Sequence, residues 1–150
     1  MASITITTNL KQVAENLRSN FEKLKDKEYF LRPLAVETIP LMKERIHERG
    51  QASDGSQIGE YANSYMRQRE KAGRGESRKV IVALTSQLEQ DWAALATDTG
   101  YGIGFNNQFN TQKMRWVEEQ KGKIIANLSA EEKKYINERI DELVNGAINP

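Results

Sequence analysis

The chain has 150 residues, 38% of them apolar, with 22 lysines and arginines, 21 acidic residues and no cysteine. This length fits one domain with a core of its own, and the lack of cysteine excludes a disulfide scaffold, a thiol nucleophile and a thiolate metal site, as is typical of a reducing compartment. The formal net charge of +1 excludes a global field that draws the molecule to DNA, RNA or an anionic membrane, so any electrostatic partner has to be met by a local surface.

The N-terminal stretch MASITITTNL lacks the basic segment and the apolar core of a signal peptide. No apolar run approaches the roughly 20 residues that a membrane-spanning helix needs. We therefore expect a protein that is made in a cytoplasm and has no membrane partner.

The first predicted helix covers about residues 9–25. Apolar residues recur at helical spacing from Leu10 to Leu24, and Asn9 with Gln12 forms a weak capping box at the start.

A second helical pattern begins at Tyr29 or Phe30 and runs into Gly50, a residue type that suits the position after a helix end. Pro33 fits the first turn of this helix. Pro40 predicts a kink or a division into two helices, because proline lacks the N–H that the helical ladder needs.

The segment 50–79 is predicted as a long polar and basic loop that contains one short helix. Its first half, GQASDGSQIGEYANSY, is rich in glycine and small polar residues and holds almost nothing that would be buried. A short helix from about Tyr61 to Lys71 leads into AGRGESRK, predicted as a mobile and mildly basic loop. A loop of this length in a compact domain is expected to be functional or disordered.

A strand, a short helix and a hairpin are predicted next. VIVAL, residues 80–84, is a β-branched run typical of a strand. TSQLEQDW predicts one or two helical turns, with Ser86 and Glu89 at capping-box spacing. In residues 93–105 a Thr-Asp-Thr-Gly turn separates two short extended segments, which predicts a hairpin.

The C-terminal third predicts a helix over about 110–121 that ends at Gly122, a last short strand at KIIANL, and a long helix in SAEEKKYINERIDELVNGAI. In this last helix Ser129 and Glu132 form a capping box ahead of one apolar stripe. Three to four helices packed on a small antiparallel sheet give an α+β fold class in a single domain, 1–150.

Catalytic chemistry finds little support in the residues. The one histidine, His47, lies among charged residues on a helix; it is either a general base or, as we favour, a solvated surface residue. The adjacent glutamates at 118–119 and 131–132 diverge by about 100° on a helix, so helix surface and capping explain them better than shared acid–base work. We expect no enzyme.

Metal and phosphate motifs are equally weak. Asp54, Ser56 and Glu60 suggest a calcium loop, but they lack the register of an EF-hand. GYGIGF, residues 100–105, lies within a strand pattern and opens no helix, so its glycines indicate close backbone approach or a bulge rather than a phosphate loop. We expect no cofactor and no metal.

One cluster of positive charge and two tryptophans remain as candidate interaction residues. The cluster is either a solvated loop or a contact to a phosphate backbone without base readout. Trp92 and Trp116 are predicted as core residues or interface anchors. The cations are Arg67, Arg69, Lys71, Arg74, Arg78 and Lys79.

Several stretches, taken in order from about residue 40 to 148, resemble the virion morphogenesis or tail completion family of tailed-phage structural proteins. The helix ending in RIHERG, followed by SDGSQIGEYANSY, is similar to the family's helix, Asp-Gly turn and basic segment. VALTSQLEQDW resembles its Leu-Thr-Gly-x-Leu signature, with Ser86 where glycine is usual. YGIGF and IIANLSAEEKKYINERIDELVNGAI resemble the strand after it, the closing strand and the final helix. The family's His-x-x-Gly and Pro-x-Arg segments are missing, and TQKMRWVEEQKG stands in their place.

The resemblance implies a non-enzymatic virion protein that forms a ring of itself, a hexamer or a dodecamer, at the head–tail joint around the DNA channel. Its partners would be the portal-side connector and the tail tube. In this interpretation the loop 50–79, with Asp54 and the six cations, faces neighbouring subunits, acidic partner surfaces or passing DNA. A tail terminator that caps the tube and a small nucleic-acid-binding module are the alternatives.

Overall fold

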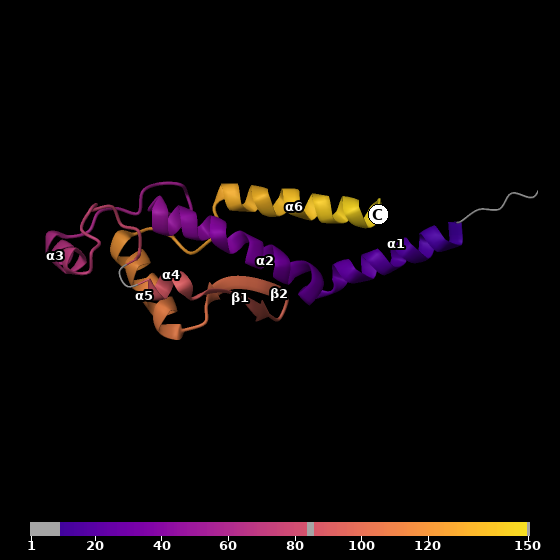
Figure 1. Cartoon of the computed structure of the whole chain (residues 1–150), viewed down its shortest axis with the longest axis horizontal. Coiled ribbons are helices and arrows are strands. Elements are labelled where there is room, and N and C mark those ends of the chain that lie inside the picture. The colour runs from indigo at the N-terminus through magenta and orange to yellow at the C-terminus, as the bar shows by residue number, and fades with distance from the viewer. Residues whose placement is uncertain (1–9, 84–85, 150) are drawn as a thin grey trace, which may run out of the picture.

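The computed structural model describes residues 10–83 and 86–149 and shows an α+β fold (Figure 1). Within these residues there are six α-helices, one π-helical turn and one two-stranded antiparallel sheet. The elements are α1 (Leu10–Lys25), α2 (Lys27–Lys43), η1 (Glu44–Glu48), α3 (Asn63–Lys71), α4 (Gln87–Gln90), β1 (Trp92–Thr97), β2 (Gly100–Phe105), α5 (Gln108–Lys121) and α6 (Ala130–Ile148).

The long helix α2 organises the molecule. The hairpin of β1 and β2 packs on one side of it and α6 lies along the other, while α1 extends toward one end and α3 lies at the opposite end (Figure 1). Trp92 pairs with Phe105 at the open end of the hairpin. At Gly100 an added Cβ would lie 2.8 Å from the Leu31 side chain, so glycine lets the hairpin approach α2 closely.

Pro40 does not divide the second helix, which corrects that part of the prediction. α2 runs through both Pro33 and Pro40, and the irregularity comes later, where the N–H of Arg49 bonds the carbonyl of Glu44 at 2.9 Å in η1. The helix ends before Gly50, as predicted. Gly50 has φ of +63°, and a Cβ there would lie 2.6 Å from the carbonyl oxygen of Val80.

The core lies between α2 with η1, the hairpin and α5. It is built mainly from large apolar side chains that are 8% exposed or less, among them Met42, Ile46, Trp92, Phe105, Met114 and Ile125. The hairpin, the helix ending at Gly122 and the capping box of Ser129 and Glu132 are all confirmed.

Two predicted strands are wrong. Residues 80–83 are buried or half-buried but form no strand. The N–H of Val80 bonds the carbonyl of Gly59 beside the isolated bridge between Glu60 and Lys79, and pairing goes no further because Val82 takes a left-handed φ of +50°; Leu84 lies outside the described residues. In KIIANL, Ile125 is fully buried, yet the backbone N–H groups of Ile125 and Ala126 donate to the Glu118 carboxylate rather than to a strand. Apolar β-branched runs predicted burial here, but not pairing.

The segment 50–65 is more deeply anchored than predicted. Ala52 and Ile58 are 1% and 2% exposed and belong to the core, and a bridge joins Gln51 to Gln57.

None of the described helices is both long and apolar enough to cross a bilayer.

Candidate interaction surfaces

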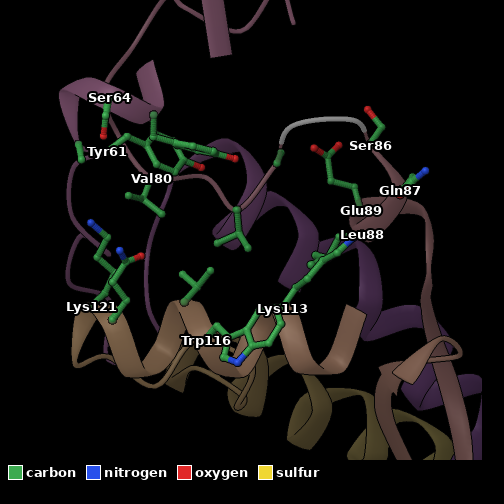
Figure 2. Close-up of a pocket in the computed structure, with 16 residues that line it drawn as sticks. Tyr61, Ser64, Val80, Ser86, Gln87, Leu88, Glu89, Lys113, Trp116 and Lys121 are labelled. Atoms are coloured by element: carbon green, nitrogen blue, oxygen red, sulfur yellow. The ribbon is translucent and has the colours of Figure 1, made fainter. Parts of the chain in front are cut away.

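A groove of about 570 Å³ opens between α5 and the chain around α3 and α4 (Figure 2). We call it the α5 groove and define it by Tyr61, Val80, Leu88, Lys113, Trp116 and Lys121. Val80 and Leu88 form an apolar floor, while Lys113, Trp116 and Lys121 rise from α5 on one wall (Figure 2).

The two tryptophans have different environments. Trp116 is 60% exposed at the α5 groove, so its role as an interface anchor stays a prediction. Trp92 is 8% exposed, and its ring lies 4.2 Å from that of Phe105, centroid to centroid. Trp92 is therefore a core residue and not an interface anchor.

The predicted basic cluster is not one surface. Arg69 is 2% exposed, donates from Nη1 to the carbonyl of Ala83 and lies 4.2 Å from the ring centroid of Tyr61. Arg74 is half-buried, donates to the hydroxyl of Ser86 at 2.9 Å and pairs with Glu89 at 3.7 Å. Arg69 and Arg74 thus hold the loop to its own domain, which corrects their assignment as outward-facing residues.

The remaining predicted residues lie nearer the surface. Arg67 and Lys71 are exposed on α3, Lys79 is half-buried, and Arg78 lies 3.9 Å from the Glu60 carboxylate.

Asp54 closes a tight turn, and hydrogen bonds from the hydroxyl and the N–H of Ser56 lower the pKa of its carboxyl.

We expect Arg69→Ala to lower the free energy of unfolding by about 2 kcal/mol, because a charge-assisted hydrogen bond and a cation–π contact are lost together. Arg67→Ala, two residues away on the same helix but exposed, should change it by less than about 0.5 kcal/mol. Urea denaturation of both variants measures the difference. Equal losses would show that burial of Arg69 adds nothing.

His47 is buried, which corrects its interpretation as a solvated residue. It is 7% exposed, its Nδ1 lies 2.9 Å from the carbonyl oxygen of Ile81, and its Nε2 lies 2.9 Å from Nε1 of Trp92. A carbonyl only accepts and an indole N–H only donates, so the ring is neutral with its proton on Nδ1. Burial lowers the pKa of His47, against smaller opposing effects of the Ile81 carbonyl and Glu89.

A buried ion pair joins the end of the second helix to the last one. Arg45 Nε lies 2.6 Å from Glu132 Oε1, with the two side chains 2% and 3% exposed. The guanidinium also donates to the backbone carbonyls of Gln51, Ile125 and Asn127, at 2.9–3.1 Å. Sequence spacing predicted Glu132 as a cap, but it gave no sign of this partner 87 residues away.

The α1 helix presents an uncovered apolar face. None of its 16 residues is buried. Its apolar residues nevertheless lie on one stripe, and Val13 and Phe21 are 41% and 44% exposed. The amide of Asn20 donates to the carbonyl of Ala147 at 3.2 Å and joins the second half of α1 to α6.

Comparison with protein-family models, curated proteins and solved structures gives no match. The function therefore has to be argued from the residues themselves. Among residues 10–83 and 86–149, no three His, Asp or Glu side chains are grouped so that they could hold a metal ion. Two candidate surfaces are the α1 face and the α5 groove, which lie toward opposite ends of the molecule (Figure 1).

Proposed function

We propose that this chain is a structural subunit of a tailed-phage virion. In this role it forms a ring around the DNA channel at the head–tail joint and connects the portal-side connector to the tail. It works by assembly and not by catalysis. The exposed cations Arg67, Lys71 and Arg78 are the ones left to face acidic partners or DNA, and a dispersed charge suits a channel because tight phosphate binding would slow passage.

The observation that carries the proposal is the backbone at Ser86. In the stretch LTSQL this serine stands where the Leu-Thr-Gly-x-Leu signature has glycine, and its φ is +65°. Only glycine enters this left-handed region without steric penalty. The conformation that a glycine signature requires is thus present at the position where the sequence departs from it, which supports the resemblance beyond a match of letters.

The uncovered face of α1 supports assembly. An isolated helix of about 15 residues or fewer is marginal in water, and most helical stability in proteins comes from packing of an apolar face. The stripe with Val13 and Phe21 therefore gains stability when a neighbouring chain covers it. A ring closes when the α1 face of one subunit packs on a different surface of the next subunit and the rotation between them fits.

Deletion of the gene from its parent phage tests the role. We expect electron microscopy of the lysate to show filled heads beside separate tails of normal length, because completed halves would lack the joint. Tails of uncontrolled length would assign the protein to the tube end as a terminator. Intact infectious particles would contradict both, and the nucleic-acid-binding module would then replace them.

Complementation of the deletion tests the assembly face. Val13→Asp with Phe21→Asp should fail to restore joined particles, because two charges would enter the apolar contact. The matched control is Gln12→Asp with Ser19→Asp, which adds the same charge about 150° around the same helix, away from the apolar stripe. Equal recovery by both pairs, with circular dichroism showing that both fold, would remove α1 from the interface.

A further inference from the structure

The α5 groove combines buried apolar residues with two lysines, and Trp116 is 60% exposed at its edge. We propose that the groove is a docking site for an acidic segment of another protein, which inserts a large apolar side chain beside Trp116. This inference does not depend on the virion role, since it follows from the groove alone.

The apolar part of the groove is suited to an anchoring side chain. Val80, Val82 and Leu88 are 1–9% exposed and make a fixed floor, whereas Trp116 stands 60% exposed at its edge. The volume of about 570 Å³ is within the usual range for a pocket that buries a ligand. A tryptophan beside a desolvated pocket is the residue type most often found to dominate binding energy.

The charge of the rim selects the partner. Lys113 and Lys121 both line the groove, and in the described part of the chain no ion pair neutralises either of them; the ammonium of Lys121 donates to a neutral carbonyl, that of Glu60, at 2.6 Å. The carboxylate of the groove, Glu89, is matched by Arg74 at 3.7 Å. Two positive charges therefore remain, and they favour acidic residues on the incoming segment.

The same charges disfavour the α1 helix of a second copy as the occupant. Lys11, Arg18 and Lys25 are seven residues apart, so they follow one edge of its apolar stripe. Lys25 is paired with Glu22 at 3.3 Å, but the helix keeps a positive net charge because it carries four cations against two glutamates. Docking α1 into the groove would bring like charges together.

Single-stranded nucleic acid is disfavoured for a different reason. Such strands need successive aromatic platforms, but the ring of Tyr61 is covered by Arg69 at 4.2 Å and packs on Tyr65 at 5.1 Å. Of the three aromatic residues that line the groove, this leaves Trp116 with an exposed ring.

Two indole N–H signals make the groove directly observable, because the chain has two tryptophans. Trp92 donates to His47 in the core, whereas Trp116 lies at the groove. We would titrate the ¹⁵N-labelled protein with a short synthetic peptide of Asp and Glu around one Leu and one Phe. The expected result is a saturable shift of the Trp116 signal with the Trp92 signal unchanged, which weakens as salt is added.

Matched peptides and variants define the result. Replacing the acidic residues of the peptide by Lys, or its Leu and Phe by Ala, should abolish the shift. Lys113→Glu should weaken binding about fivefold, as expected for reversal of one exposed charge. Arg115→Glu, on the same helix but outside the groove, should leave it unchanged. Trp116→Ala, followed by fluorescence anisotropy of the labelled peptide, should weaken it at least about tenfold.

Three outcomes would overturn the inference. The first is no shift of Trp116 with the acidic peptide, or an equal shift with the lysine peptide. The second is a Trp116 shift on raising the protein concentration alone, which would make a second copy the occupant. The third is a stronger shift with an oligothymidine strand than with the acidic peptide.

Discussion

Glu132→Ala is expected to lower the free energy of unfolding by about 3–5 kcal/mol, the usual effect of removing one partner from a buried ion pair. The loss comes from Arg45, which is 1% exposed. Its guanidinium would keep its hydrogen bonds to backbone carbonyls but would lose the carboxylate that lies 2.6 Å away. Urea denaturation followed by far-ultraviolet circular dichroism measures the change.

Two neighbours in the same helical turn serve as controls. Glu131→Ala removes a side chain that is 80% exposed and 3.5 Å from Arg49, so it should lose less than about 1 kcal/mol. Ser129→Ala removes the other half of the capping box and should lose about 1 kcal/mol. If Glu132→Ala lost no more than Ser129→Ala, the ion pair with Arg45 would contribute nothing beyond capping. Should the alanine variant fail to fold, Glu132→Gln gives the same comparison.

The predictions that succeeded rest on local physics. The cap at Ser129, the turn between the two strands and the stop at Gly122 each depend on residues within a few positions of one another. The predicted strand at residues 80–84 failed because its apolar pattern reports burial, whereas Val82 sets a left-handed backbone that no hydrophobic pattern encodes.

The buried polar residues were missed because their partners are distant in sequence. The charges around His47 predict a solvated helix surface, yet three consecutive residues, 45–47, are buried in η1. Successive helical side chains point about 100° apart, so a helix end that buries three in a row is enclosed from several sides. That enclosure comes from chain around Ile81 and Ile125, and sequence spacing on one helix cannot show it.

The candidate surfaces also differ in whether the sequence alone could predict them. The apolar stripe of α1 and the exposed Trp116 were visible as sequence features, because periodicity and residue type suffice to mark them. The α5 groove was not, since it needs α3, α4 and α5 to be placed together (Figure 2). Arg69 illustrates the limit: it is one of the six cations of the predicted basic cluster, but of these six it is the one that is buried against Tyr61.

His47→Leu is expected to lower the free energy of unfolding by about 2–4 kcal/mol, because the Nε1–H of Trp92 and the carbonyl of Ile81 would both lose their partner in the interior. Leucine restores the apolar volume but can neither donate nor accept. Trp fluorescence during urea denaturation measures the loss, because Trp92 leaves the core on unfolding whereas Trp116 is already 60% exposed. Unchanged stability would mean that water replaces both bonds, so that the imidazole is not required.

The same geometry makes the fold sensitive to mild acid. A second proton on the imidazole has to bind to Nε2, the atom that accepts the hydrogen bond from the N–H of Trp92. The two N–H groups would then face each other, so the folded protein binds this proton less readily than the unfolded chain does. The unfolded state binds more protons below the ordinary pKa of 6.5, and stability therefore rises with pH in this window and falls as the pH drops toward the lowered folded pKa. This pH range isolates the effect of His47, because His47 is the one histidine of the chain and the lowered pKa values of Asp54 and Asp91 affect stability only near and below 3.8.

His47→Gln tests this pH dependence. Glutamine keeps a donor and an acceptor but does not titrate, so the loss of stability between about pH 7.5 and 5 should shrink in this variant. An equal loss in both proteins would assign the acid sensitivity to other groups and leave His47 with a purely structural hydrogen-bonding role.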